Sequence, residues 1–258
     1  MPASNGLYYF LHEAGKPSRP PVVLLHGAGG SHLSWPPEFR RMGGQRVYAL
    51  DLPGHGKSEG VGKQSAADYA KTVAEFLDTA SIWKAVFVGH SMGGAIALTL
   101  ALDHPERTAG LGLLSCGARL PVAPSLLENS ANPATYALAL QFLLDGLFSP
   151  HADARLKAQT SRLLAATRPA VLHGDLVACN AFDVTKSLEK VRTPTLVLCG
   201  DEDRLTPLRF SQALANHIPS AALQTVDGAG HAVMLEQPRR VSLLLSVFLM
   251  TIPYTPGA

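Results

Sequence analysis

Cysteine is scarce in this sequence. Cys116, Cys179 and Cys199 are its only three cysteines, and no two of them form a CxxC pair. An odd number of cysteines is a poor basis for a disulfide framework, and these spacings match no common zinc-ligand pattern. We therefore expect no metal site and three buried thiols in a reducing compartment.

Charged residues are also few. They make up 16% of the chain, the formal net charge is +2, and the basic residues are scattered and form no stripe. A protein that binds nucleic acid or an anionic membrane would normally show a basic patch. We therefore expect no nucleic acid and no membrane as partner, but a small molecule. The composition says nothing about the oligomeric state.

Long apolar runs are missing as well. No run is long enough to span a bilayer, and the first six residues, Met-Pro-Ala-Ser-Asn-Gly, lack the charged and apolar regions of a signal peptide. We therefore expect a cytoplasmic protein.

The hydrophobic content, in contrast, is high. It reaches 47% over 258 residues, which favours one compact α/β domain with a sizeable core. Short apolar runs that stop at glycine-rich or polar turns indicate buried strands, and the segments between several of them have helical periodicity. Strands that alternate with helices predict a mostly parallel central sheet flanked by helices. The predicted strands are 22–25, 46–50, 85–88, 111–115, 195–199 and 223–226, and the predicted helices are 65–79, 92–103, 207–217 and 239–250.

One segment, residues 121–187, interrupts this alternation. It has no convincing strand, but it has helical runs at 136–147 and 154–166. We predict a helical cap at 121–187, inserted into a core domain formed by residues 1–120 and 188–258. The cap should lie over the carboxyl edge of the sheet, where open α/β sheets hold their ligands.

A serine on a sharp turn is the main chemical signal. Gly89-His-Ser-Met-Gly93 fits the pattern G-x-S-x-G, with an apolar strand before it and an alanine-rich helix after it. In such a turn the hydroxyl is exposed, and the glycines leave room for a strained backbone. We therefore predict that Ser91 is a nucleophile.

A serine hydroxyl needs an adjacent base, which a carboxylate orients. For a serine on this kind of turn, the acid and then the histidine follow along the chain. His231 follows a short strand and is the predicted base. Asp201, Glu202 and Asp203 all follow an earlier strand on one loop, so reach alone leaves the three carboxylates as rivals for the acid.

Five motifs occur in order along the chain: His26-Gly-Ala-Gly-Gly30, Asp51-Leu-Pro-Gly-His-Gly-Lys-Ser58, Gly89-His-Ser-Met-Gly-Gly94, Gly200-Asp-Glu-Asp-Arg-Leu-Thr-Pro207 and Gly230-His-Ala-Val-Met-Leu-Glu-Gln-Pro238. They cover nearly the whole chain outside the insertion. With them the chain resembles the α/β-hydrolase fold family, and more narrowly its branch of small serine carboxylesterases, enol-lactonases and carbon-carbon hydrolases. The resemblance implies that Asp203 is the acid.

An oxyanion hole needs two preorganised donors, and backbone N–H groups supply them in this kind of site. The natural pair is the N–H of Met92 and one N–H from the loop that starts at His26. The resemblance points to Ala28 for the second donor.

Substrate contacts are expected mainly from the insertion. Its apolar residues at helical spacing predict a pocket for a short or medium acyl group, lined by Leu140, Phe142 and Leu143, with His90 beside the nucleophile. The alternative is that half or more of these apolar side chains only pack the cap against the core.

The resemblance implies a carboxylesterase-type serine hydrolase that cleaves an ester substrate through an acyl-enzyme and needs no cofactor. A lactonase or a carbon-carbon bond hydrolase with the same triad is the alternative. The second of these is weakened by His90 and Ala232, where that group typically has Asn and Trp. A ligand-binding receptor without catalysis is a further alternative, since the fold alone never guarantees an activity.

Overall fold

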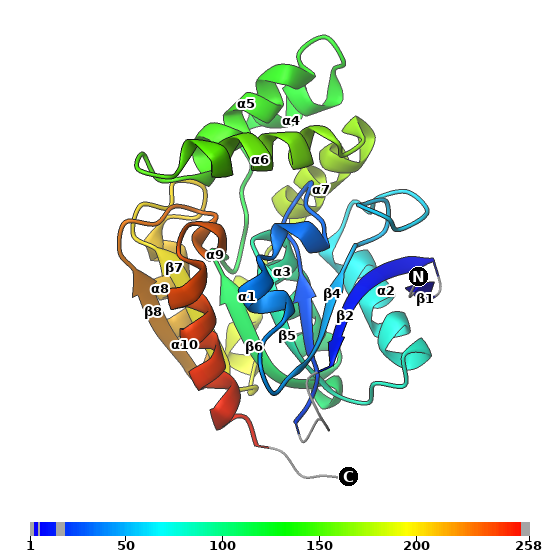
Figure 1. The fold of residues 1–258 in the computed structure, drawn as a ribbon, viewed down its shortest axis with the longest axis vertical. Coiled ribbons are helices and arrows are strands. Elements are labelled where there is room, and N and C mark those ends of the chain that lie inside the picture. The colour runs from blue at the N-terminus through cyan, green and yellow to red at the C-terminus, as the bar shows by residue number, and fades with distance from the viewer. Residues whose placement is uncertain (1–2, 5, 14–18, 254–258) are drawn as a thin grey trace.

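An eight-stranded sheet forms the centre of the structure (Figure 1), which is a computed structural model that describes residues 3–4, 6–13 and 19–253. The strand order is β1-β2-β4-β3-β5-β6-β7-β8. β1 and β2 pair in antiparallel fashion at one edge, β2 is antiparallel to β4, and the strands from β4 to β8 all run parallel. The strands are β1 (Ala3–Ser4), β2 (Leu7–Glu13), β3 (Val22–Leu25), β4 (Arg46–Leu50), β5 (Ala85–His90), β6 (Thr108–Leu114), β7 (Thr195–Gly200) and β8 (Ala221–Val226).

Helices connect the parallel strands, as expected for right-handed crossovers, and two more follow the last strand, β8. They are α1 (Pro37–Arg40), α2 (Ala66–Thr79), α3 (Met92–Asp103), α4 (Pro124–Ala131), α5 (Tyr136–Leu147), α6 (Ala154–Ala165), α7 (Pro169–Ala181), α8 (Leu208–His217), α9 (Val233–Glu236) and α10 (Pro238–Thr251), with short 3-10 turns η1 (His32–Ser34), η2 (Pro105–Arg107) and η3 (Thr185–Lys190).

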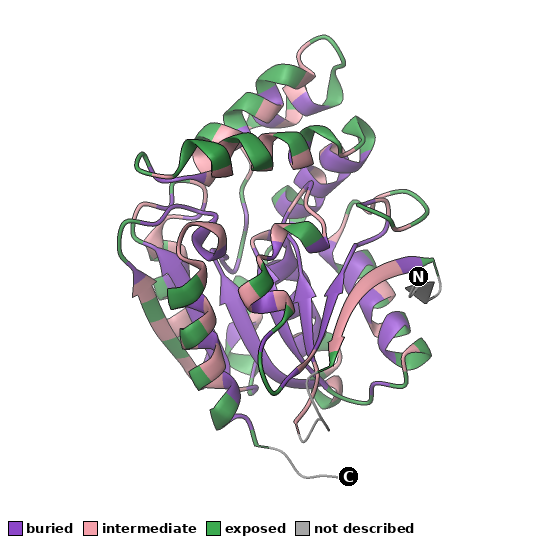
Figure 2. Cartoon of the chain, in the orientation of Figure 1, coloured by how far each residue is buried: buried purple, intermediate pink, exposed green. Residues whose placement is uncertain are grey.

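The sheet has an apolar core on each face. In β3, Val23 and Leu25 pack with α2, α3 and α8, whereas Val22 and Leu24 pack with α1 and α10 on the other side. Successive side chains of a strand point to opposite faces. Both faces are therefore covered, which explains why the central strands are continuous apolar runs in the sequence. Figure 2 shows these strands buried, with the exposed residues on the outer sides of the helices.

The predicted mostly parallel sheet flanked by helices is confirmed. The predicted helix at 92–103 coincides with α3, and the predicted strand at 46–50 coincides with β4. Strand β2 was missing from the prediction. Its residues are mostly half-buried, but Leu7-Tyr-Tyr-Phe-Leu11 is an apolar, aromatic-rich run typical of a strand, so the sequence does carry a signal for it.

Four helices, α4 to α7, lie between β6 and β7 in the sequence and above the carboxyl ends of the parallel strands in space (Figure 1). They share a small apolar core of their own, which includes Leu126, Leu143, Leu164 and Leu172. The predicted helical runs correspond to α5 and α6, whereas α4 and α7 were not predicted. The division into a core domain and a cap at residues 121–187 stays a prediction.

The three cysteines are buried and free. Burial raises the pKa of the Cys116 thiol to about 12, which leaves it unreactive at neutral pH. Within the described residues, no helix has both the length and the apolar character needed to cross a membrane. The N-terminal stretch in which we expected no signal peptide lies partly outside those residues.

Candidate active site

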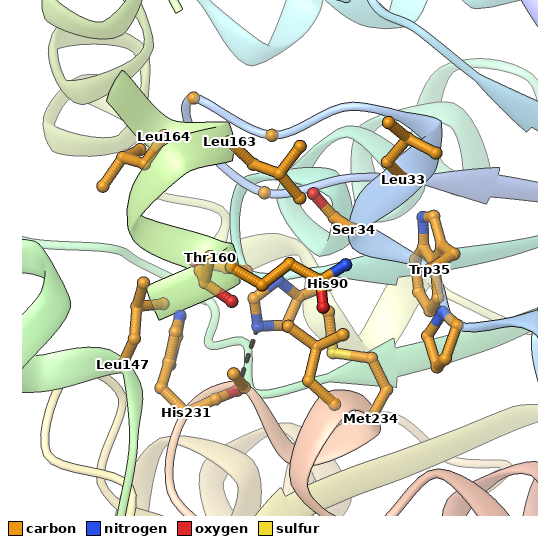
Figure 3. Close-up of a pocket in the computed structure, with 18 of the residues that line it drawn as sticks. Leu33, Ser34, Trp35, His90, Leu147, Thr160, Leu163, Leu164, His231 and Met234 are labelled. Atoms are coloured by element: carbon orange, nitrogen blue, oxygen red, sulfur yellow. Dashed lines mark hydrogen bonds between the residues drawn. The ribbon is translucent and has the colours of Figure 1, made fainter. Parts of the chain in front are cut away.

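A cavity of about 390 Å³ lies between the helices above the sheet and the carboxyl ends of the strands. The loop 27–30, Ser91 and His231 form its floor, and apolar side chains from α5 and α6 form much of its wall. Figure 3 shows leucines of these helices opposite His90 and His231. The cavity therefore brings residues from several separate loops and helices around one space.

Ser91 occupies the turn between β5 and α3. Its φ of 52° and ψ of −116° lie in a region that residues other than glycine rarely adopt. The turn is held because the N–H of Ser91 donates to the carbonyl of Leu114 over 2.9 Å and its carbonyl accepts from Gly94 over 2.8 Å. The predicted nucleophile thus has a strained backbone conformation directly before the first residue of α3.

Two glycines flank this turn for steric reasons. A Cβ atom on Gly89 would collide with the backbone carbonyl of Gly93, and a Cβ atom on Gly93 would collide with the backbone carbonyl of Leu25. Backbone atoms cannot move aside as a flexible side chain can. The pattern G-x-S-x-G therefore reflects close packing of the turn against β3 as well as its backbone conformation.

His231 lies against Asp203. Its Nδ1 atom is 3.1 Å from Oδ1 and 3.0 Å from Oδ2 of the carboxyl group, and both residues are buried. Since an ionised carboxylate only accepts hydrogen bonds, Nδ1 carries the proton and donates it. In the neutral imidazole, Nε2 is then free to accept a proton, as a general base requires.

Asp203 is kept ionised by its surroundings. Burial works against the charge, but His231 and the hydrogen bonds from Thr206 outweigh it and lower the pKa of the carboxyl from its ordinary value. The backbone N–H and the hydroxyl of Thr206 each donate to Asp203 over 2.8 Å. Sequence reasoning missed Thr206, although it belongs to the motif that ends at Pro207.

The two rival carboxylates have other environments. Asp201 is exposed and accepts a hydrogen bond from the N–H of Gly228 over 2.7 Å. Glu202 makes no hydrogen bond with an imidazole among the described residues. Of the three candidates on this loop, the structure brings only Asp203 to His231.

His90 lies beside His231. Its Nε2 donates to the backbone carbonyl of His231 over 2.9 Å, and burial, reinforced by His231, lowers the pKa of His90 to about 3. A Cβ atom on Gly27 would lie 2.9 Å from Nδ1 of His90. The neutral ring therefore packs between the loop 27–30 and the backbone of the predicted base.

The predicted oxyanion donors belong to the loop 27–30 and to the start of α3. Met92 is the first residue of α3, and the first N–H groups of a helix have no partner within it. Ala28 lies in a turn that the hydrogen bond from Gly30 N–H to the carbonyl of Gly27 closes over 3.1 Å. Within the described part of the chain, neither the Ala28 N–H nor the Met92 N–H donates to another residue, so both remain available.

His26 fixes the start of the same loop. Its Nδ1 donates to the carbonyl of Gly27 over 2.8 Å, and its Nε2 accepts from the N–H of Leu52 over 3.0 Å. Burial and the neighbouring His55 lower the pKa of His26 to about 4. This histidine is therefore neutral and structural, and it ties the loop to the Asp51–Ser58 motif.

The four predicted substrate contacts do not all lie at the cavity. His90 and Leu143 line the cavity, but Leu140 and Phe142 do not. Leu140 packs within the small core of α4 to α7, and Phe142 is 45% exposed. Helical spacing identified an apolar helix, but it did not identify which turn of that helix faces the cavity.

Other lining residues were not predicted. Trp35, Gln159, Thr160 and Leu163 also line the cavity, and Figure 3 shows Trp35, Thr160 and Leu163 around it. The sequence offered no signal for them, because neither η1 nor the inner face of α6 was recognisable as part of a pocket.

Comparison with known proteins identifies the family. The family model for the alpha/beta hydrolase fold matches residues 20–238. The chain therefore belongs to the α/β hydrolase fold family, as its motifs suggested, and it is a hydrolase of that fold.

Individual relatives differ in their named activities. A Caulobacter vibrioides protein that carries the name carbamate hydrolase RutD is 32% identical, over 95% of this chain and 96% of its own. The 2-hydroxymuconate semialdehyde hydrolase of Pseudomonas putida is 32% identical, over 93% of this chain and 89% of its own. The solved structure of a thermophilic esterase from Thermogutta terrifontis is 26% identical, with a TM-score of 0.86 over 96% of this chain and 94% of that one.

Proposed function

We propose that this hydrolase is a serine carboxylesterase that cleaves carboxylic esters of short to medium acyl chain through an acyl-enzyme. One observation carries the proposal. A strained serine turn, a histidine bonded to a buried carboxylate and two free backbone N–H donors surround a single, largely apolar cavity.

The geometry supports a two-step acyl transfer. The hydroxyl oxygen of Ser91 attacks the ester carbonyl while Nε2 of His231 takes its proton. The N–H groups of Ala28 and Met92 donate to the oxyanion, and Asp203 stabilises the imidazolium. The intermediate collapses as His231 gives the proton to the leaving alcohol. Water then attacks the acyl-enzyme with His231 as base, and it releases the acid and free Ser91.

The size and wall of the cavity support a modest acyl group. Its volume of about 390 Å³ is near the lower end of the range for small-molecule sites, roughly 300 to 1,000 Å³. The leucines of α5 and α6 match an alkyl chain, which gains about 0.8 kcal/mol for each buried methylene group.

A carbamate is the second candidate substrate, because one relative carries that name. A carbamate carbonyl meets the same nucleophile and the same oxyanion donors. A small polar carbamate, however, leaves the leucine wall without a partner, so the apolar cavity favours the ester. Carbon-carbon cleavage, the alternative that the sequence motifs left open, would use the same triad.

The test compares these substrates on one enzyme preparation. We expect p-nitrophenyl esters from acetate to palmitate to be hydrolysed with an optimum at short or medium chains, and faster than a lactone, an aryl carbamate or a ring-cleavage dienol. A fluorophosphonate should label Ser91, and Ser91→Ala should lose both labelling and hydrolysis while it unfolds at the wild-type temperature. Ester hydrolysis that survives in folded Ser91→Ala would contradict the proposal.

A further inference from the structure

A completely buried carboxylate, Asp175, joins helix α7 to three segments of the core. Its Oδ2 atom accepts from the N–H of Gly29 over 2.8 Å and from Nε2 of His55 over 2.7 Å. Its Oδ1 atom accepts from the hydroxyl of Tyr69 over 2.6 Å. A buried charge needs such partners, since without them burial would be very unfavourable.

His55 supplies the opposite charge. Its Nδ1 atom lies 3.1 Å from the carbonyl of Pro53, and its Nε2 atom faces Asp175. Both neighbours are acceptors, so both ring nitrogens carry protons. Burial opposes this cation, but the charge and hydrogen bond of Asp175 outweigh it and raise the pKa of His55. Asp175 is therefore held in place by an ion pair with the core.

Gly29, the third partner, belongs to the predicted oxyanion loop and is held from both sides by the segment above it. Its N–H donates to Asp175, and its carbonyl accepts from the hydroxyl of Thr167 over 2.7 Å. Its φ is 65°, and a Cβ atom there would lie 2.6 Å from Leu164. One of these two polar contacts thus comes from α7 and the other from the turn between α6 and α7.

The three successive peptide groups of this loop are fixed in orientation. The carbonyl of Gly27 accepts from Gly30 and from His26, so the N–H of Ala28, which belongs to the same planar peptide, points the opposite way. The next peptide is fixed by Asp175 through Gly29, and the third by Thr167. The peptide held by Asp175 meets the Ala28 N–H peptide at the Ala28 Cα atom, so loss of that contact would free the backbone on one side of the donor.

We propose that Asp175, assisted by Thr167, is a positioning residue that holds the oxyanion loop in its active orientation, so that the rate of the chemical step depends on how helix α7 sits on the core. This inference rests on the proposed function, since it assigns the Ala28 N–H to the oxyanion. It gives the segment above the sheet a part in transition-state stabilisation in addition to lining the cavity.

The experiment compares Asp175→Ala, Thr167→Val and the control Tyr69→Phe, which removes one hydrogen bond to Asp175 without touching Gly29. For a p-nitrophenyl ester, kcat should fall about 10- to 100-fold in Asp175→Ala and about threefold to tenfold in Thr167→Val, with KM within about twofold. The inhibition constant of a trifluoromethyl ketone, whose adduct places an oxyanion between the two donors, should rise by the same factor by which kcat falls. Tyr69→Phe should keep kcat and the inhibition constant within about twofold.

A second readout does not depend on activity. Backbone amide exchange of residues 26–30 should accelerate in Asp175→Ala and in Thr167→Val, but not in Tyr69→Phe. If Asp175→Ala does not fold, Thr167→Val, a substitution of similar shape at a half-buried position, carries the test. Folded variants with wild-type kcat, ketone affinity and amide exchange would overturn the inference. Hydrolysis retained by Ser91→Ala would overturn the proposed function instead, and the exchange of residues 26–30 would still decide whether Asp175 holds the loop.

Discussion

The ring of His90 donates a hydrogen bond to the backbone carbonyl of His231 over 2.9 Å, and the two ring centroids lie 4.8 Å apart. The residue before Ser91 thereby fixes the backbone of the predicted base, which comes from a different loop. His90 is neutral in this arrangement, because burial of its ring, reinforced by the neighbouring His231, lowers its pKa.

The stability of the fold should consequently fall in mild acid. The pKa is lowered to about 3 for His90 and to about 4 for His26, whereas both residues titrate near 6.5 in the unfolded chain. Between these values the unfolded state binds more protons than the native state, so stability decreases as the pH falls from about 6.5. The slope is about 1.4 kcal/mol per pH unit for each group.

Urea unfolding at pH 7, 6, 5 and 4 measures this effect. Asp203 does not mask it, because the stability that comes from its lowered pKa is fully present above about pH 4 and is lost only as the pH falls further. His90→Phe, which keeps a ring but cannot be protonated, should flatten the slope. A pH dependence identical to that of the wild type would contradict the assignment of a buried neutral His90.

The role of Asp203 is tested by a pair of matched substitutions on one loop. Asp203→Asn keeps the shape but removes the charge that fixes the tautomer of His231, so we expect kcat to fall about 10³- to 10⁴-fold. In Asp201→Asn the side-chain oxygen can still accept from Gly228, and kcat should stay within about twofold. Comparable losses of kcat in both variants would show that activity depends on the conformation of the loop and not on the carboxylate of Asp203.

The residues of the site that lie within sequence motifs were the most predictable from the sequence. Ser91 and Asp203 follow buried strands, and His231 follows the partly exposed strand β8. Parallel strands bring the turns at their carboxyl ends to one edge of the sheet. The choice of Asp203 over Asp201 and Glu202 needed the family resemblance, because residues on one loop differ only in side-chain direction, which the sequence does not encode locally.

Contacts between distant segments could not be predicted. Asp175 meets Gly29 only because α7 docks on the core, and nothing in the sequence near either residue marks that meeting. The same limit explains why Leu140 and Phe142 do not line the cavity. Periodicity defines an apolar helix face, whereas the turn of the helix that reaches the cavity depends on how α5 sits above the sheet.

The glycine after the nucleophile turn should be indispensable for folding. Alanine at Gly93 would press a Cβ atom against the backbone carbonyl of Leu25, while at Gly43 a Cβ atom would meet nothing within 4 Å. We expect Gly93→Ala to lower the free energy of unfolding by about 3 kcal/mol or more, or to prevent folding. Gly43→Ala should change it by no more than about 0.5 kcal/mol. Thermal and urea unfolding measure the free energy of unfolding of both variants. Equal stabilities would mean that the backbone around Gly93 can shift to make room for a Cβ atom, which would contradict the prediction.

The acyl-chain optimum should respond to Leu163, which faces the cavity from α6 (Figure 3). Leu163→Phe fills part of the cavity and should lower kcat/KM for longer p-nitrophenyl esters while it spares the acetate. Leu163→Ala should shift the optimum to longer chains. Each methylene group gained or lost from the pocket is worth about 0.8 kcal/mol, or roughly fourfold in kcat/KM. Phe142→Ala removes an exposed ring from the neighbouring helix α5 and should leave the chain-length profile unchanged. If Phe142→Ala shifted the profile and the two Leu163 variants did not, the acyl group would have to bind outside this cavity, because of these two residues Leu163 lines the cavity and Phe142 does not.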